Sequence, residues 1–209
     1  LHLSIRRQRQ MCIRDRHYQY TQDEKFLGEF YPVMKGAVEF FMDFLTPHPN
    51  GKWLVTNPST SPENFPRSPG NEKYFDEVTG SMIPGTTICA GSSIDMQILS
   101  DLFTHYAKAC KLLNVDEEFA KKVEEARKKL VPPQIGKDGT LQEWTEDWGQ
   151  LEENHRHFSH LYGLYPGNVL SLKKTPELMN ACKAVLEQRG DGGTGWSRAW
   201  KVALWARSV

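Results

Sequence analysis

Apolar side chains recur every three or four residues along much of this 209-residue chain, and that spacing constrains its fold more than any other feature. The pattern is clearest over residues 93–113, where it places apolar side chains on one face of a helix. It returns over residues 116–130, and Pro132 and Pro133 end this second helix because proline lacks an amide hydrogen. Two helices joined by so short a connection pack antiparallel, so the sequence predicts a helical hairpin.

The same spacing predicts four further helices. They cover residues 23–30, 32 to about 45, 175–187, and 196 to the end of the chain. Pro32 and Pro176 would lie in the first turns of their helices, where proline is tolerated. Hairpin character is predicted for residues 53–56 and for residues 134–144, which bend at Lys137-Asp138-Gly139.

The predicted helices come as consecutive pairs joined by long loops, which is typical of a toroid of helical hairpins. Only six or so are present, and the last reaches the end of the chain without a glycine, asparagine or proline to stop it. We therefore expect an all-α fold, with short β-hairpin insertions in its loops, in a chain truncated at both ends.

Charge and cysteine usage exclude several classes of protein. Lys+Arg and Asp+Glu balance at 26 each, so no global field favours nucleic acid or an anionic membrane. No apolar run approaches the roughly 20 residues of a transmembrane helix, so no membrane insertion is expected. The four cysteines have no CxxC spacing, which favours free apolar thiols over disulfides or zinc ligands. They are Cys12, Cys89, Cys110 and Cys182.

The first sixteen residues, LHLSIRRQRQMCIRDR, differ abruptly from the remainder of the chain. Their arginines could form a nucleic-acid-binding arm. The run also resembles a translated sequencing-library adapter of the kind found at the ends of bacterial metagenomic gene fragments. We expect a non-native or disordered arm over residues 1–16, with Ile5, Met11 and Ile13 outside the core, and one partial domain over residues 17–209.

Polar chemistry is concentrated between residues 143 and 207, in the stretches HRHFSHLYGLYPG and RGDGGTGWSRAW. Guanidinium, imidazole, carboxylate and indole groups beside glycine turns suit a concave pocket for a polar, ring-shaped ligand. Trp196 or Trp200 could supply a stacking face. The sequence thus indicates a sugar as the ligand.

Two carboxylates stand in separate glycine- or proline-rich loops. Glu63 follows Pro62 in a stiff turn and could be held as a proton donor, or it could be an ordinary exposed residue of a surface turn. Asp191 precedes the last predicted helix, where an anion is stabilised, so it suits a base or a simple helix cap. The glycines around Asp191 lack the Lys-Ser/Thr ending and the preceding strand of a phosphate loop.

Three imidazoles, His155, His157 and His160, lie close together in sequence. Their HxHxxH spacing is not that of a zinc-binding HExxH helix, so no metal is expected. Arg156 and His157 are predicted hydrogen-bond donors to sugar hydroxyls, whereas His155 and His160 could be structural. The acidic segment 142–147, which contains Trp144, could line the same rim or form a solvated loop.

Paired carboxylates beside Arg, His and Trp are typical of glycoside hydrolysis, in which one acid protonates the leaving oxygen and a base activates water. From about residue 17 to residue 209 the chain resembles part of the catalytic domain of glycoside hydrolase family 95, the inverting α-L-fucosidases. The matching stretches are TSPEN (60–64), SSIDMQILSDLF (92–103), LQEWTEDW (141–148), HRHFSHLYGLYPG (155–167), TPEL (175–178) and RGDGGTGWSRAWKVALWAR (189–207).

The resemblance implies an (α/α)6 barrel whose loops form a sugar pocket, and no cofactor. Glu63 matches the general acid of the family, and Asp191 matches the carboxylate that helps to activate water. Arg156 and His157 match sugar-contacting residues, and Trp144 and Trp196 complete the predicted substrate-binding set. The expected partner is a fucosylated oligosaccharide or glycan, and the expected location is secreted or periplasmic.

The resemblance also implies that this chain lacks part of the catalytic machinery, and it leaves two other functions open. The family positions its water with an N-x-N asparagine pair, and no such pair precedes the TSPEN stretch, so we expect the 209-residue chain alone to be inactive. Inversion predicts that the carboxyl groups of Glu63 and Asp191 face one cavity at roughly 6.5–9.5 Å. The alternatives are an α-L-galactosidase of the same family and a carbohydrate-binding helical domain without catalysis.

Overall fold

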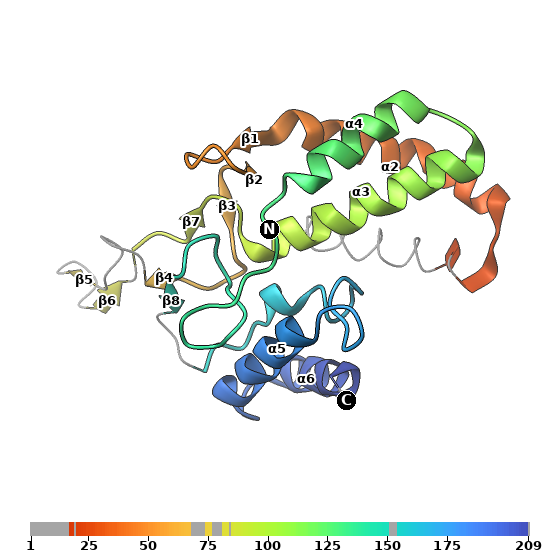
Figure 1. Ribbon diagram of the computed structural model, residues 1–209. Coiled ribbons are helices and arrows are strands. Elements are labelled where there is room, and N and C mark those ends of the chain that lie inside the picture. Colours follow the sequence, from red (N-terminus) through yellow and green to blue (C-terminus); the bar gives the residue numbers. More distant parts are fainter. Residues whose placement is uncertain are drawn as a thin grey trace. The chain divides into compact units, whose positions relative to one another are not determined.

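The computed structural model of the chain describes residues 17–18, 20–67, 74–76, 81–83, 85–150 and 154–208 (Figure 1). The chain divides into two compact units. Unit 1 comprises residues 1–45 and 99–130, and unit 2 comprises residues 46–98 and 131–209. The predictions for residues 1–16, including those for Cys12, Ile5, Met11 and Ile13, lie outside the described residues.

Unit 1 is built from helix α2 (Glu24–Phe44), helix α4 (Glu117–Lys128) and the greater part of helix α3 (Ser93–Leu113). In Figure 1, α4 runs back alongside α3, which confirms the predicted helical hairpin. The apolar faces of these helices form the core of the unit. Its buried residues include Leu27, Phe30, Met34, Val38, Leu102, Phe103, Tyr106, Ala109, Val123 and Ala126.

Helix α2 differs from the sequence prediction, which was wrong in dividing it at Pro32. The helix starts after Asp23, whose carboxylate accepts the Phe26 amide at 3.0 Å, and continues through Pro32 to Phe44. A proline inside a helix costs about 3 kcal/mol. The buried stripe of Leu27, Phe30, Met34 and Val38 continues on both sides of Pro32, so burial of this face offsets the cost.

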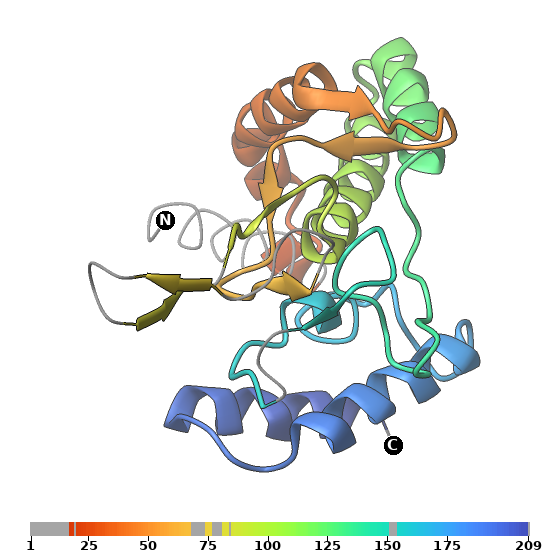
Figure 2. The same ribbon diagram turned by 90° about the vertical axis from the view of Figure 1, so that its left-hand side faces the viewer.

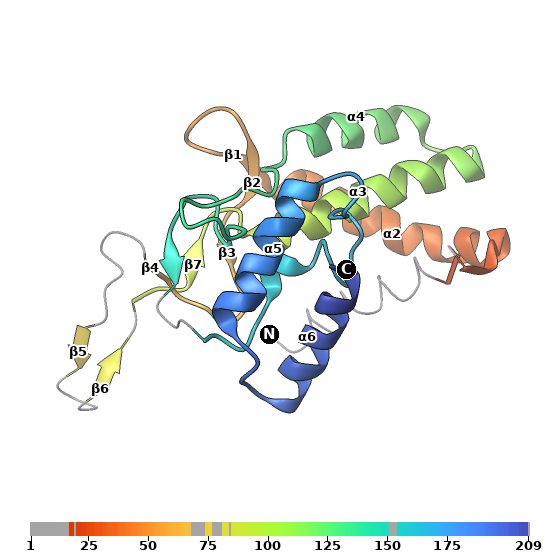
Figure 3. The ribbon, with the colours of Figure 1, turned by 60° about the horizontal axis from the view of Figure 1, so that its bottom comes forward.

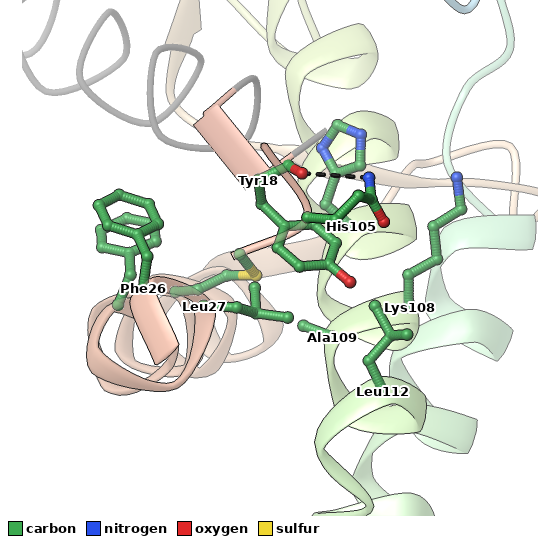
Figure 4. A pocket seen from close by; sticks show the side chains of 10 residues that line it. Tyr18, Phe26, Leu27, His105, Lys108, Ala109 and Leu112 are labelled. Carbon is green, nitrogen blue, oxygen red and sulfur yellow. Dashed lines mark hydrogen bonds between the residues drawn. The ribbon is translucent and has the colours of Figure 1, made fainter. Parts of the chain in front are cut away.

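A cavity of about 170 Å³ lies within unit 1. Figure 4 shows Phe26 and Leu27 of α2 on one side of it and His105, Ala109 and Leu112 of α3 on the other. Most of the lining surface is apolar, although Gln22, His105 and Lys108 also line the cavity.

Unit 2 contains short strands that pair two by two. Strand β1 (Leu45–Pro47) pairs with β2 (Leu54–Thr56), β3 (Ser59–Thr60) with β7 (Ile88–Cys89), β4 (Pro66–Arg67) with β8 (Gly149–Gln150), and β5 (Tyr74–Asp76) with β6 (Ser81–Ile83). The β3–β7 register places Ser59 opposite Cys89, and the β4–β8 register places Pro66 opposite Gln150. The turn between β3 and β4 carries Glu63. Figure 2 shows these strand pairs as small ribbons within the loops.

The helices of unit 2 are α5 (Pro176–Arg189), α6 (Gly195–Arg207) and the single 3-10 turn η1 (Ser159–Leu161). Helices α5 and α6 lie side by side in Figure 3 and are in contact. Helix α5 ends at Gly190, whose φ of 57° favours glycine. Their shared core contains Leu141, Phe158, Leu161, Leu164, Leu170, Met179, Ala181, Cys182, Val185, Leu186 and Leu204.

The side-chain amide of Gln97 connects the first turns of α3, which belong to unit 2, to the backbone of residues 160–163. Gln97 is 2% exposed; its Nε2 donates to the carbonyl oxygen of His160 at 2.7 Å, and its Oε1 accepts the Gly163 amide at 2.5 Å. The first turns of α3 therefore hold residues 160–163, at the end of the HRHFSH stretch and just after it, by paired hydrogen bonds.

Most of the remaining predictions agree with the structure. The helix predicted over residues 175–187 is present as α5, and the helix predicted from residue 196 is present as α6. The hairpin character predicted for residues 53–56 is present as β2, which pairs with β1. Residues 134–144 also turn back as predicted: Ile135 bridges Leu141, and the Gly136 and Gln142 amides donate to the carbonyl oxygens of Thr140 and Gln134 at 2.8 and 2.9 Å.

The three described cysteines are free and buried, and they are Cys89, Cys110 and Cys182. Burial raises the pKa of the Cys89 and Cys182 thiols to about 12. Among the residues that the structure describes, no helix is long and apolar enough to cross a membrane.

Candidate active site

Glu63 lies at the tip of a β-turn in unit 2. The Asn64 amide donates to the Ser61 carbonyl oxygen at 3.1 Å, which makes Pro62 and Glu63 the two central residues of the turn. Proline is favoured at the first central position because its φ is already that of the turn. The turn therefore directs Glu63 outward, and its side chain is 54% exposed.

Arg156 and His157 approach Glu63 from the HRHFSH stretch. The Arg156 guanidinium forms an ion pair with Glu63 Oε2, and His157 Nε2 lies 3.4 Å from the same oxygen. The predicted proton donor and both predicted sugar-contacting residues are thus brought together.

The backbone that presents Arg156 and His157 is held by unit 2 side chains. Ser197 Oγ donates to the carbonyl oxygen of Arg156 at 2.8 Å, and the Arg189 guanidinium donates to the carbonyl oxygen of His157. Burial, assisted by His155 and Arg156, lowers the pKa of His157, so the imidazole is neutral at neutral pH.

Trp196 extends the same group of side chains. Its ring centroid lies 4.8 Å from that of His157, with the two planes tilted by 58°. Trp196 is 47% exposed, so a face of the indole is open to a ligand beside the Glu63 carboxylate and its two partners. Its role as a stacking surface for a sugar ring stays a prediction.

Asp191 lies in the exposed turn between α5 and α6, five residues before Trp196. Lys201 holds this turn, because its Nζ donates to the carbonyl oxygens of Gly190 and Gly192 on either side of Asp191. Burial lowers the pKa of Lys201, and the Asp191 charge opposes that change. The predicted separation of roughly 6.5–9.5 Å between the carboxyl groups of Glu63 and Asp191 stays a prediction.

Trp144 occupies a different environment. It is 3% exposed and lines a cavity of about 330 Å³ whose walls also include Trp148, Asp147 and Arg67. The substrate-binding role predicted for Trp144 stays a prediction.

Glu143 is the functional candidate that sequence reasoning missed. The sequence predicts that residues 142–147 line the rim of the pocket or form a solvated loop, yet Glu143 is 5% exposed. Its carboxylate accepts hydrogen bonds from Ser61 Oγ at 2.5 Å, Asn64 Nδ2 at 3.0 Å and Arg189 at 2.7 Å. A single acidic residue between Leu141 and Trp144 is the only sequence signal of its burial.

The charge of Glu143 is balanced by buried neighbours. Burial alone would raise its pKa, but His160, Arg189 and the Ser61 hydroxyl outweigh burial and lower the pKa to about 2. Burial lowers the pKa of His160 itself to about 3, so at neutral pH this imidazole is neutral and Arg189 is the counter-ion of Glu143. His155 and His160 are 1% and 2% exposed, in keeping with structural imidazoles.

The described residues contain no group of three or more His, Cys, Asp or Glu side chains that could hold a metal ion. The side chains that the structure brings into contact are a carboxylate, an arginine, a neutral imidazole and an indole.

Comparison with known proteins identifies the family. Residues 13–209 match the family model of the glycosyl hydrolase family 95 catalytic domain. The chain belongs to this family. Its helices are accordingly part of the (α/α)6 barrel of family 95, and the match begins inside the arm that the sequence predicted to be foreign.

Two relatives of this chain agree with this membership. The chain is 39% identical to "Alpha-L-fucosidase 2" of Arabidopsis thaliana over 193 residues, which is 91% of this chain and 21% of the relative. It is 30% identical to "Probable alpha-fucosidase A" of Aspergillus niger over 201 residues, or 91% of this chain and 23% of the relative. The chain therefore spans about a fifth of the length of these relatives, which are plant and fungal proteins.

Proposed function

We propose that the protein containing this chain hydrolyses terminal α-L-fucosyl linkages of oligosaccharides and glycans with inversion at the anomeric carbon. Its membership of family 95 and the names of its relatives support a fucosidase. The observation that carries the proposal is the contact of Glu63 with both Arg156 and His157, beside the exposed ring of Trp196.

In the proposed reaction, Glu63 donates its proton to the glycosidic oxygen as the bond to the sugar breaks. A water molecule attacks the anomeric carbon from the opposite face with the assistance of Asp191, whose carboxylate accepts the proton that this water loses. The asparagine pair of the family is absent from residues 1–62, so its contribution would come from chain outside this sequence.

Arg156 and His157 are proposed to bind the sugar hydroxyls. Arg156 supplies guanidinium donors, and the neutral ring of His157 can donate from one nitrogen and accept at the other. A hydroxyl that binds Arg156 competes with the Arg156–Glu63 ion pair. Sugar binding would thus free the Glu63 carboxylate to take up a proton from solvent, which it then donates to the glycosidic oxygen. We place the protein in a secreted or periplasmic location, as expected for an enzyme that meets extracellular glycans.

The first test uses a protein of the relatives' full length that carries this sequence, assayed on an aryl α-L-fucoside and on a fucosylated oligosaccharide. Proton NMR of the first product formed should show β-L-fucose, since inversion converts an α-linkage to a β-product. Release of α-L-fucose first would contradict inversion. Release of L-galactose from an α-L-galactoside in preference to L-fucose would assign the site to the alternative substrate.

Two substitutions separate the roles of the carboxylates. Glu63→Gln should lower kcat about 10²–10⁴-fold on the oligosaccharide and much less on the aryl fucoside, whose leaving group needs less protonation. Asp191→Asn should lower kcat on both substrates because water attacks in either case. Equal losses of well under about tenfold for both variants would show that neither residue is catalytic.

A further inference from the structure

The turn that carries Glu63 is fastened to Glu143 on both sides. Ser61 lies two residues before Glu63 and donates to Glu143 Oε1 at 2.5 Å, while Asn64 follows Glu63 directly and donates to Oε2 at 3.0 Å. Both donors are 0% exposed, whereas Glu63 between them is more than half exposed. The buried flanks therefore fix the direction in which Glu63 points.

The same carboxylate contacts the other two segments of the site. Arg189, at the end of α5 and two residues before Asp191, donates to Glu143 Oε2 at 2.7 Å. Ser159 donates to Oε1 at 3.3 Å, and His160 Nδ1 lies 3.4 Å from Oε2, so the HRHFSH stretch reaches Glu143 as well.

We infer that Glu143 is a positioning residue that holds together the three loops carrying Glu63, Arg156–His157 and Asp191. The inference rests on the proposed function, because those loops are the proposed active site. Glu143 touches none of the reacting groups directly and acts through Ser61, Asn64 and Arg189.

The arrangement requires a carboxylate at position 143. Its partners are hydroxyl, amide and guanidinium donors, and an ionised carboxylate is acceptor-only with about four lone-pair sites. A glutamine would have to direct its NH₂ group either at Ser61 and Ser159 or at Asn64 and Arg189. In the second case two donors face each other, and in both cases Arg189 loses its buried counter-ion.

The test compares Glu143→Gln with Glu143→Asp in the full-length protein. The glutamine variant should lower kcat on the oligosaccharide at least tenfold, and the aspartate variant, which keeps the charge, should restore part of the loss. Hydrogen exchange should quicken together in peptides covering residues 59–65, 154–161 and 188–195, while peptides of α2 keep their wild-type rates. A general loss of stability would not select these three segments.

Glu146→Gln is the matched control. Glu146 lies in the same segment, its side chain is 40% exposed, and it pairs with His48 at 3.1 Å. This variant should stay within twofold of the wild-type kcat and leave the three exchange rates unchanged.

A milder variant covers the case in which Glu143→Gln fails to fold. Ser61→Ala removes one donor and leaves the Glu143–Arg189 pair intact. It should quicken exchange in residues 59–65 and lower kcat about threefold or more. If both variants fold, the effect of Ser61→Ala on kcat should largely vanish in the Glu143→Gln background, since the two groups act through one contact.

Two results would overturn the inference. One is a folded Glu143→Gln protein with wild-type kcat and wild-type exchange in all three segments. The other is a double variant whose loss of kcat equals the product of the losses caused by Ser61→Ala and Glu143→Gln alone. Failure of the proposed function would look different: the unsubstituted protein would release no fucose, yet the exchange rates would still report whether Glu143 joins the loops.

Discussion

Asp116 in unit 1 and Glu143 in unit 2 each bind several polar groups, and these two clusters differ in burial. In unit 1, Asp116 accepts Lys35 Nζ and the Tyr31 hydroxyl, both at 2.6 Å, and its side chain is 30% exposed. In unit 2, Glu143 is 4% exposed by side chain and is held by Arg189 and neutral donors. The loops of unit 2 also bury apolar side chains, including Leu141 and Phe158. Buried polar bonds therefore add to apolar packing where the candidate site is formed.

The largest expected effect comes from removing the cation of the buried cluster. Arg189→Ala leaves the Glu143 carboxylate buried without its counter-ion, which should destabilise the folded protein by about 3–5 kcal/mol. Urea denaturation of the full-length protein, followed by tryptophan fluorescence, measures this change. A loss below about 1 kcal/mol would mean that water replaces Arg189 and that the buried cluster contributes no more to the free energy of unfolding than a surface ion pair.

Acid should weaken the buried cluster next. His160 has a lowered pKa of about 3, so the unfolded chain binds a proton below about pH 6.5 that the folded chain does not. Stability should therefore fall as the pH drops from about 6.5 to about 3. Glu143, with a lowered pKa of about 2, adds a loss from about pH 4.3 downward.

The Tm measured between pH 7 and pH 4 checks this dependence, with His160→Gln as the informative variant. Its neutral side chain removes the first contribution, so its Tm should depend less on pH than that of the wild type. A pH profile unchanged by the substitution would contradict the assignment.

Removing one hydroxyl from the unit 1 cluster should have a smaller effect. Tyr31 OH donates to Asp116 and also contacts the Tyr106 hydroxyl at 3.1 Å and Cys110 Sγ at 3.3 Å. Burial, followed by the bond to Asp116, raises the pKa of Tyr31, so the phenol is protonated at every physiological pH. Tyr31→Phe should cost about 0.5–1.5 kcal/mol, because Lys35 still accompanies Asp116. Thermal unfolding with Tyr20→Phe as an exposed control measures it.

The smallest effect is expected from the half-exposed ion pair itself. Lys35→Met should change the free energy of unfolding by less than about 1 kcal/mol, since solvent screens the pair. In 1 M salt, where the Debye length is about 3 Å, the difference between variant and wild type should shrink further. If this substitution proved as costly as Arg189→Ala, the distinction between the two clusters would disappear.

Sequence periodicity was sufficient for most of the helices, because each buries one stripe of apolar side chains. It failed at Pro32, where a local rule against proline gave way to the packing of residues on both sides. It could not show the strand pairs β3–β7 and β4–β8, since these strands are two residues long and their partners lie far away in the sequence.

The candidate site was predictable in part. Motifs singled out Glu63, Arg156 and His157, and the structure brings these three into contact. The burial of Glu143 and Trp144 was not predictable, because residues 142–147 read as acidic and solvated. Their environment is set by contacts with Ser61, Arg189 and the cavity walls, which no local pattern encodes.

The paired hydrogen bonds of Gln97 restrict which substitutions the sequence can accept at this position. One side-chain amide donates to His160 and accepts from Gly163, so position 97 needs a donor and an acceptor at a fixed reach. Glutamate has the right shape but no donor when ionised, asparagine is one methylene too short, and methionine has neither group. Position 163 is restricted too, because a β-carbon there would lie 2.8 Å from Gln97 Oε1. Substitutions at positions 97 and 163 are therefore coupled: a change at one position requires a compensating change at the other.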